Sequence, residues 1–556
     1  MKKNLHKYWP IITVLVLAVF VAWPTFLPGY FSHHDDLQVM RIFEMRRCLT
    51  DLQIPCRWVP DMGYGNGYPL FNYYAVFPYY IGAIASFLLG YLGAAKLLFA
   101  IPLFLGSISM FLLASELYGV YPGILASVIF TYAPYRSLDL YVRGAVAESF
   151  ALTIAPLILY FTLKFIKSGN LKYFIGLSLM LACFLTSHNI MTVLFLPVFL
   201  VIIVYWLILY KGKNFTKLIL GLAIGVGLSS FFILPAFFEK NLVQIDNLIR
   251  LDLNFRAHFV TVNQLFFSRF WGYGASSPGS DDTISFQIGW PHWWIAIMAI
   301  LVFIIKVRSN HKPGNLFQLI LFIIFLSSVF MTHIRSAFIW EKIEILKFTQ
   351  FPWRFLAVTT FSVSLLASYV MQNIEVKQKK IVLVFLIILT IILNWNYFRP
   401  KEFYFDLTDR EKLSGKLWDD QKQAAILDYL PVTAVRPQEP AQENPLIISG
   451  KATIQNFEKR SNRWQFQVTA SGNTIIEVPI FDFPKWDVKV NGLPAKYSSK
   501  NYLGRIDVIL NKSGQYLVTA KMTDTPIRQV SNTISTASLI ILLLSIFYGK
   551  NNKYFG

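Results

Sequence analysis

The chain has 556 residues, of which 55% are hydrophobic and 16% aromatic, and its mean hydropathy is +0.48. Apolar runs long enough to cross a ~30 Å hydrocarbon core with about 20 helical residues recur along it, which excludes an ordinary soluble domain. The formal net charge of +20 would indicate nucleic-acid binding in a soluble protein. Here the lysines fall in short connections between apolar runs, where cytoplasmic positive charge is expected, so we expect no nucleic-acid partner.

The first apolar run, residues 9–31, predicts a retained transmembrane helix, because it is long and no small-residue cleavage site follows it. Lys2, Lys3 and Lys7 hold the N-terminus in the cytoplasm. The residues that follow this run are therefore expected outside the cell membrane.

Lysine clusters in the later connections indicate whether an even or an odd number of the earlier apolar runs crosses the bilayer. All of them are cytoplasmic only if an even number of the runs 70–92, 96–117 and 120–135 crosses the bilayer. We place 70–92, rich in Tyr, Gly and Pro, along or re-entering the outer leaflet, which leaves about 12 full spans, or 13 if it crosses. The predicted spans are 9–31, 96–117, 120–135, 148–167, 171–187, 190–210, 217–238, 289–307, 315–333, 353–372, 380–398 and 528–548.

A polar motif, Ser32-His33-His34-Asp35-Asp36, directly follows the first span. Ionisable side chains near a bilayer cost several kcal/mol unless they are hydrated, paired or used, so these residues are functional candidates. The alternative is a helix start, with Ser32 as N-cap and the two acids in the first turn.

Residues 35–49 predict an amphipathic helix at the membrane surface, because apolar residues recur there at helical spacing beside charged ones. Arg41, Arg46 and Arg47 on this helix either form a solvated, salt-bridged face or hold a lipid phosphate. Cys48 and Cys56 lie in the same predicted outer loop, where they are able to pair.

Further polar stretches reach the same predicted outer face. Arg143 and Glu148 are either an ion pair between helix ends or part of a site. His188-Asn189 is either a helix break with capping side chains or a second part of it. Arg354 follows Trp353 at the start of a span, where it is either an interfacial anchor or a site residue. The long loop 239–288 lies on that face too.

Residues 399–527 change character. Alternating stretches such as Trp464 to Val468 and Trp486 to Val490, separated by turn dipeptides, predict a small antiparallel β-sandwich outside the membrane. Trp464, Trp486 and Tyr502 either stack on sugars or, as we prefer, pack the core. The predicted organisation is a transmembrane domain over 1–398 with an outer loop over 32–95, the β-rich domain over 399–527, and a last helix with a cytoplasmic tail over 528–556.

An acidic motif after the first span, a second polar motif, many spans and an extracytoplasmic C-terminal domain together resemble the GT-C superfamily of membrane glycosyltransferases. More narrowly, the chain resembles the bacterial and archaeal membrane family described as 6-pyruvoyl-tetrahydropterin-synthase-related, although no zinc-binding histidine triad of the soluble synthase is visible. The tract Phe483-Pro484-Lys485-Trp486 with Asn491-Gly492 is similar to the last domain of YfhO-type membrane proteins. The residues that carry the narrower resemblance are His33 to Asp36, Gly65 to Phe71, Arg143-Gly144-Ala145 with Glu148, His188-Asn189 and Phe351 to Arg354.

The resemblance implies an inverting glycosyltransferase that takes sugar from a polyprenyl-phosphate donor and gives it to an extracytoplasmic saccharide, lipid or protein acceptor. Asp35 or Asp36 is the expected base, and Arg143 and Arg354, with Arg41 in reserve, are expected to neutralise the leaving phosphate. Glu148 and His188 are expected to orient acid or sugar. We expect Asp35, Asp36 and Glu148 to be catalytic and the following residues to bind substrate: His33, His34, Arg41, Arg143, His188, Asn189 and Arg354.

No cofactor is expected, although a divalent metal on Asp35, Glu148 and His188 is an alternative. Two other functions remain open: a flippase for lipid-linked saccharides, which would need polar residues in mid-span, and a non-catalytic assembly protein of the cell envelope.

Overall fold

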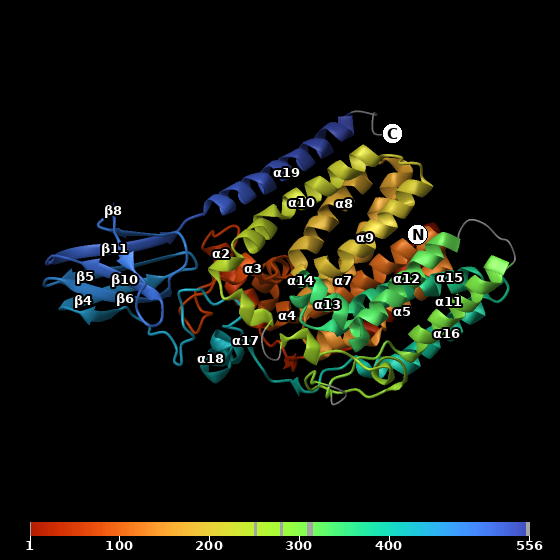
Figure 1. The fold of residues 1–556 in the computed structure, drawn as a ribbon, viewed down its shortest axis with the longest axis horizontal. Coiled ribbons are helices and arrows are strands. Elements are labelled where there is room, and N and C mark those ends of the chain that lie inside the picture. The colour runs from red at the N-terminus through yellow and green to blue at the C-terminus, as the bar shows by residue number, and fades with distance from the viewer. Residues whose placement is uncertain (1, 250–252, 279–281, 309–314, 552–556) are drawn as a thin grey trace.

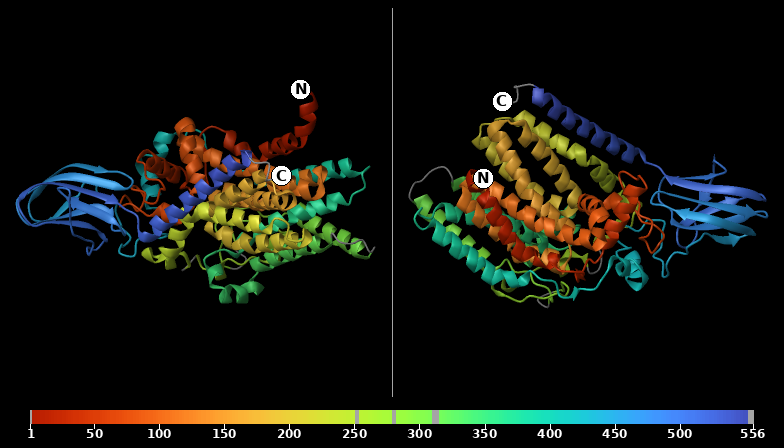
Figure 2. Two further views of the ribbon diagram at one scale, coloured as in Figure 1. Left: turned by 90° about the horizontal axis from the view of Figure 1, so that it is seen from above. Right: turned by 180° about the vertical axis from the view of Figure 1, so that it is seen from behind.

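A computed structural model describes residues 2–249, 253–278, 282–308 and 315–551. Figure 1 shows a bundle of helices with a β-sandwich projecting from one end. Helix α1 (Lys2–Ala22) begins, and helix α19 (Pro526–Asn551) ends, on the side of the bundle remote from the sandwich (Figures 1 and 2).

Nine helices among the described residues are long and apolar enough to cross a membrane, and a tenth is counted if a pair bent by 97° at residue 333 is one span. The chain is therefore a multi-pass helical membrane protein, as predicted. All twelve predicted spans coincide with helices, but α5 (Val120–Thr131) and α8 (Leu171–Ser187) have only 12 and 17 residues. Fewer than twelve helices thus meet the length of a full crossing. Besides α1 and α19, the long ones are α4 (Phe77–Tyr118), α7 (Val146–Ser168), α9 (Asn189–Leu209), α10 (Phe215–Phe238) and α11 (Trp290–Arg308). Helices α15 (Leu356–Gln372) and α16 (Lys379–Asn394) reach this length with the 3-10 turns Pro352–Phe355 and Trp395–Tyr397 that adjoin them, and the bent pair starts with α12 (Asn315–Thr332).

These helices pack in a continuous series. Helix α19 lies on α10, α10 on α8, α8 on α7, α7 on α4, α4 on α5, and α5 on α15, which α11 and α12 cover. Short helices fill the connections: α3 (Leu70–Tyr73), α6 (Pro134–Ser137), α13 (Ala337–Lys342) and α14 (Glu344–Lys347).

The run 70–92 forms α3 and the first part of α4, which a kink at Gly90 separates from the part that continues to Tyr118. Gly90 has a φ of +69°, which glycine adopts without the penalty other residues meet. Beyond the kink, the Asp409 carboxylate accepts hydrogen bonds of 2.7 and 2.8 Å from the N–H groups of Tyr91 and Leu92. A distant carboxylate therefore caps the second half of α4.

The predicted amphipathic surface helix over 35–49 is corrected. Helix α2 spans Gln38–Thr50 and buries polar as well as apolar residues, including Arg41 and Glu44. It lies within the protein because its charges find partners there: Glu44 accepts hydrogen bonds from the N–H groups of Asp61 and Met62 at 2.8 and 3.2 Å. Internal pairing removes the cost that would otherwise keep such a helix at the surface.

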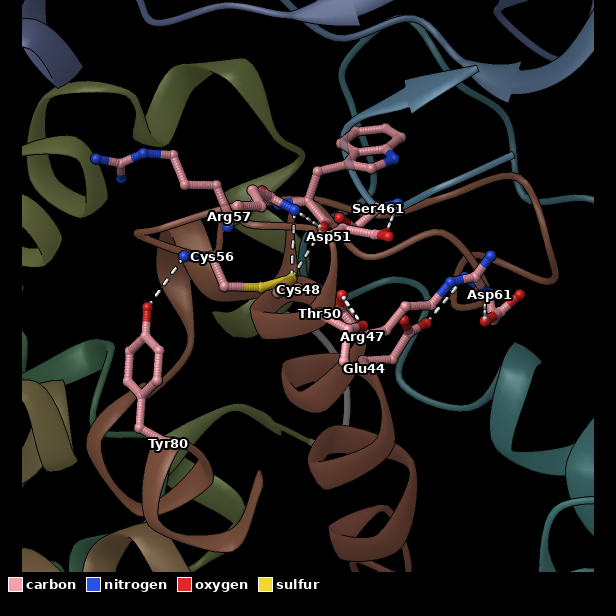
Figure 3. The surroundings of a disulfide bond; sticks show 12 residues. Glu44, Arg47, Cys48, Thr50, Asp51, Cys56, Arg57, Asp61, Tyr80 and Ser461 are labelled. Atoms are coloured by element: carbon pink, nitrogen blue, oxygen red, sulfur yellow. Dashed lines mark hydrogen bonds and ion pairs between the residues drawn. A yellow bond between two sulfur atoms is a disulfide. The ribbon is translucent and has the colours of Figure 1, made fainter. Parts of the chain in front are cut away.

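Cys48, near the end of α2, forms a disulfide with Cys56, a pairing that the sequence left open (Figure 3). The loop that it closes contacts the sandwich, since Asp51 accepts a 2.7 Å hydrogen bond from the Ser461 N–H. Figure 3 shows Arg47 pointing to Asp61 on the other side of this turn. The disulfide thus fixes the segment on which the sandwich rests.

The predicted β-sandwich is present over residues 446–522 and has two antiparallel sheets. Alternate residues of β5 (Arg463–Ala470) are buried between the sheets, as the period-two pattern requires. Trp464 and Trp486 are buried in this core, as expected, but Tyr502 is 81% exposed and does not pack there. One sheet has the order β3 (Leu446–Ser449), β6 (Thr474–Phe481), β10 (Arg505–Leu510), β9 (Tyr497–Ser498), and the other β4 (Ala452–Lys459), β5 (Arg463–Ala470), β11 (Gly514–Met522), β7 (Trp486–Val490), β8 (Leu493–Pro494).

The segment before the sandwich packs on the helical bundle. Strand β2 (Phe403–Tyr404) pairs with β1 (Tyr30–Phe31), directly before the polar motif, and α17 (Asp409–Lys412) and α18 (Gly415–Gln423) come next along the chain. We call residues 403–429 the strap. It brings a late part of the chain to the end of the first helix.

Candidate functional site

One cavity of about 640 Å³ gathers eight of the ten predicted site residues. Its walls come from several separate parts of the chain, among them the segment after α1, the starts of α7 and α15, the α8–α9 turn, and the strap. The eight residues are His34, Asp35, Arg41, Arg143, Glu148, His188, Asn189 and Arg354.

Backbone pairing places Asp35 in this wall. The His34 N–H donates to the Val142 carbonyl and the Asp35 N–H to the Arg143 carbonyl, both at 2.9 Å. Gly144, with a φ of +70°, lets the second strand of this pairing turn close beside His33. The two polar motifs that lie far apart in the sequence are thus held side by side by main-chain bonds.

The Asp35 carboxylate is fixed but not closed off. Its Oδ2 lies 2.6 Å from Arg41 Nη1, and its side chain remains 32% exposed while that of Arg41 is 4% exposed. The Arg41 guanidinium lies 4.2 Å from the centre of the Tyr74 ring, which restricts its movement. One carboxylate oxygen is therefore left facing the cavity.

Asp36 and His33, the other two predicted residues, do not line the cavity. Asp36 Oδ2 lies 2.5 Å from Nζ of Lys412 in the strap, and the side chain of His33 is fully buried behind the wall. The alternative of a helix start at Ser32 is also wrong, because α2 begins at Gln38 and Ser32 pairs with the backbone of Glu402. Asp36 therefore holds the strap in place.

A charged cluster lies at the start of α7. Glu148 is fully buried, and its Oε2 lies 3.0 Å from Arg143 Nη1 and 3.3 Å from Arg354 Nε. The ion pair proposed as the simpler alternative for Arg143 and Glu148 thus exists, with Arg354 as a third member. Arg354 is buried and is not an interfacial anchor. Each guanidinium has five N–H donors, so both retain donors beyond those that hold Glu148.

Asp139 completes this cluster and was not singled out from the sequence. Its carboxylate is fully buried and accepts hydrogen bonds from Arg143 Nη1 at 2.6 Å and from the Ser149 hydroxyl at 2.7 Å. Burial, followed by the neighbouring Glu148 charge, raises the pKa of Asp139 above its usual range. The Tyr135 hydroxyl also donates to Glu148. The only available signal was the acid four residues before Arg143.

His188 caps α9, as the simpler alternative predicted. Its Nδ1 accepts a hydrogen bond from the Met191 N–H at 3.2 Å, and Asn189 Nδ2 donates to the Tyr73 carbonyl at 3.1 Å. Burial lowers the pKa of His188 to about 3, so the ring is neutral at pH 7. With Nδ1 acting as an acceptor, the ring proton lies on Nε2.

The strap adds residues to the cavity wall that no sequence pattern indicated. Ala425, Asp428 and Tyr429 line it. The Tyr68 hydroxyl holds this turn, since it donates to the Ala425 carbonyl at 2.8 Å and accepts from the Tyr429 N–H at 2.6 Å. A second carboxylate, besides Asp35, therefore reaches the cavity from outside the helical bundle.

Within the described ranges, no group of three His, Cys, Asp or Glu side chains is close enough to hold a metal ion. Asp35, Glu148 and His188 therefore do not form the ligand set that was the alternative to a metal-free site. Glu148 is instead surrounded by the Tyr135 hydroxyl and two guanidinium groups.

The helices, the polar cavity and the sandwich define a multi-pass membrane protein with a site assembled at helix ends. A family model for the 6-pyruvoyl-tetrahydropterin synthase related domain, described as a membrane protein, matches residues 71–401. This match covers more than half of the chain, and the chain belongs to that family.

Other proteins are similar over parts of the chain. An uncharacterized protein of Lactococcus lactis subsp. cremoris (strain MG1363) is 26% identical over 248 residues, which are 42% of this chain and 40% of that protein. Arabinofuranosyltransferase AftD from Mycobacteria aligns with a TM-score of 0.44 and 15% identity over 72% of this chain and 29% of its own. ArnT from Cupriavidus metallidurans bound to undecaprenyl phosphate aligns with a TM-score of 0.38 and 11% identity over 67% of this chain and 61% of its own. The chain thus spans less than two thirds of each, and the TM-scores are too low to transfer a mechanism.

Proposed function

We propose that the protein is a membrane glycosyltransferase that moves a sugar from a polyprenyl-phosphate donor to an acceptor hydroxyl, with inversion. One observation carries the proposal: an accessible carboxylate, Asp35, and two arginines, Arg143 and Arg354, face one cavity of about 640 Å³ in a membrane protein. Transfer from a lipid phosphate needs a base, cations for the leaving group, and room for both substrates. The resemblance of the sequence to the GT-C superfamily agrees with this choice of donor.

Asp35 is the proposed base. Its unengaged oxygen takes the proton of the acceptor hydroxyl while the acceptor oxygen forms a bond to the anomeric carbon. The bond between that carbon and the phosphate oxygen breaks, and the electron pair leaves with the polyprenyl phosphate. Arg41 keeps the carboxylate oriented through its 2.6 Å contact, so the base needs no rearrangement before reaction.

Arg143 and Arg354 are the proposed phosphate ligands. Their donors that are not bound to Glu148, Asp139 or backbone carbonyls are available to the oxygens on which negative charge develops. Both oxygens of Glu148 are already engaged, one by the Tyr135 hydroxyl and the other by the two guanidinium groups. We therefore propose Glu148 as a positioning residue that sets the two guanidinium groups, rather than as the catalytic group expected from the sequence.

We further propose that the cavity opens to the extracytoplasmic side. Disulfides form and persist in oxidising compartments, and Cys48–Cys56 lies on the segment that follows the cavity-lining Asp35. The lysine pattern of the sequence predicts the same orientation. His34, His188 and Asn189 are proposed to contact the sugar or acceptor from the cavity wall.

The test compares Asp35→Asn with Asp36→Asn in proteoliposomes supplied with radiolabelled polyprenyl-phosphate sugars and a panel of saccharide, lipid and peptide acceptors. Removing a general base costs about 10²- to 10⁴-fold in rate, so Asp35→Asn should lose transfer by that factor. Asp36→Asn is the matched control, because Asp36 lies beside Asp35 but outside the cavity, and the Asn side chain keeps an oxygen that accepts a hydrogen bond from Lys412.

Wild-type transfer with equal activity in Asp35→Asn would show the base assignment to be wrong. A wild-type protein that moves intact lipid-linked saccharide across the bilayer and transfers none would favour the flippase. Retained biological function in a variant with Asp35, Arg143 and His188 all changed to alanine would favour an assembly protein.

A further inference from the structure

Asp428 is a carboxylate in the cavity wall whose presence the proposed reaction does not yet explain. Helical and strand patterning does not place it, since it belongs to the turn between α18 and the sandwich. It lines the same cavity as Asp35 and Arg41. Any role of Asp428 toward the acceptor rests on the proposed function.

The turn that carries Asp428 is rigid. Its Tyr429 ring stacks on that of Tyr73 at 5.5 Å between centroids and 21° between planes. Tyr68 binds the backbone on both sides of Asp428, at Ala425 and Tyr429. The carboxylate is therefore held in the wall without the backbone freedom to turn back into solvent.

Among the described residues, no hydrogen bond or ion pair reaches the Asp428 carboxylate. It is influenced only through space, by Arg41 and by Asp35. Burial, with Asp35 adding and Arg41 opposing, raises the pKa of Asp428 to about 6, so the group is mostly ionised at neutral pH. The Asp428 carboxylate thus has no protein donor among the described residues, and a hydroxyl-bearing ligand in the cavity supplies one.

We propose that Asp428 accepts a hydrogen bond from a second hydroxyl of the acceptor, next to the hydroxyl that Asp35 deprotonates, and that the acceptor is therefore a saccharide. Both carboxylates lie within electrostatic range of each other and of Arg41, which keeps two like charges tolerable in one wall. The ring pair of Tyr73 and Tyr429 lines the same wall and offers the apolar surface on which a sugar ring packs. A serine side chain or a simple lipid alcohol has a single hydroxyl and therefore offers no second hydroxyl to Asp428.

The experiment measures steady-state transfer in proteoliposomes, first with methyl hexopyranosides as acceptors and then with their monodeoxy analogues, each of which lacks one hydroxyl. Hydrogen bonds to charged groups are among the stronger ones, so Asp428→Asn should raise KM for the hydroxylated acceptor about 10- to 100-fold with kcat changed less than about threefold. With the deoxy analogue that lacks the second hydroxyl, wild type and Asp428→Asn should be equal. Asp419→Asn, an exposed acid of the same strap, should resemble wild type.

The outcomes separate this proposal from the proposed function. If Asp35→Asn is inactive but Asp428→Asn has wild-type KM for every acceptor, the transferase proposal stands and the Asp428 proposal fails. Efficient wild-type transfer to a serine peptide or a simple lipid alcohol, and none to any glycoside, also overturns it. Loss of transfer with Asp428→Asn that is equal for hydroxylated and deoxy acceptors would indicate a structural role and refute it as well. Thermal melting and gel filtration of each variant confirm that the proteins compared are folded.

Discussion

Gly144 is the position at which the site is most sensitive to a single added carbon. A Cβ built there would lie 2.2 Å from Cδ2 and 2.9 Å from Cγ of His33. The His33 ring has no room to retreat, because it packs edge-on against Tyr30, Phe31 and Phe99, with ring centroids 5.5, 5.9 and 5.1 Å away. Gly144→Ala therefore forces apart the two backbone segments that place Asp35.

The cost has two parts. A left-handed conformation costs an alanine about 1–2 kcal/mol, and overpacking a close-packed interior costs a further ~1–3 kcal/mol. Gly212 provides a matched control, because its φ of +68° is close to the +70° of Gly144 while a Cβ there meets nothing within 4 Å. Gly212→Ala carries the strain alone, so the difference between the variants, about 1–3 kcal/mol, measures the clash.

Amide hydrogen exchange on the purified protein tests this locally. The His34 and Asp35 amides donate to the Val142 and Arg143 carbonyls, so a loss of about 1–3 kcal/mol in local stability should speed their exchange roughly 5- to 150-fold in Gly144→Ala. Gly212→Ala should leave both amides unchanged. Equal exchange at these amides in the two variants would refute the claim that Gly144 sets the pairing.

Three other predictions concern stability, each measured by thermal or chemical denaturation in detergent. Glu239→Gln should cost about 3–5 kcal/mol, because its carboxylate is paired inside the protein, whereas Glu341→Gln in an exposed pair should cost at most ~1 kcal/mol; equal effects would contradict this. Replacing Cys48 and Cys56 by serine should cost about 2.5 kcal/mol from loop entropy, and a reductant that fails to destabilise wild type would count against it. The pKa of His188 is about 3 in the folded state and about 6.5 in the unfolded state, so the unfolded state binds more protons below pH 6.5 and the protein loses stability as the pH is lowered. His188→Asn, which keeps a cap, should remove about 1–2 kcal/mol of the stability loss between pH 7 and pH 5. A pH profile of stability that is the same in the variant and in wild type would contradict this prediction.

Local patterns were sufficient for the elements and for much of the site. Apolar runs located the helices, and alternation located the sandwich. Asp35, Arg143 and Glu148 were brought to one side by counting crossings, because the parity of the spans decides which connections share a face. Counting crossings could not decide between Asp35 and Asp36, because adjacent residues lie on the same side of the membrane and differ only in where their side chains point.

The features that the sequence analysis misread or missed have a common physical cause. Helix α2 has the composition of a surface helix, but Glu44 binds the backbone of residues 61–62 and Arg41 packs on the Tyr74 ring, so both are buried. Asp428 reaches the cavity on the strap, which is anchored to Asp36 through Lys412 and to the Tyr91 N–H through Asp409. No window of sequence contains both ends of these contacts, so propensity and periodicity cannot indicate them.

The cavity has two chemically different sides, and the architecture accounts for both. Glu148 lies in the first turn of α7, His188 caps α9, and Arg354 immediately precedes α15, so three helices begin at the wall that holds the arginines. Helix N-termini carry partial positive charge and favour anions, which suits this side to a phosphate. Asp35 and Asp428 stand on a loop and on the strap instead, and carboxylates accept hydrogen bonds, so that side is suited to donors such as hydroxyl groups. A reaction that moves a group from a phosphate to a hydroxyl needs these two sides in one cavity. The side with the carboxylates is complete only when the strap has folded onto the bundle, because the strap supplies Asp428.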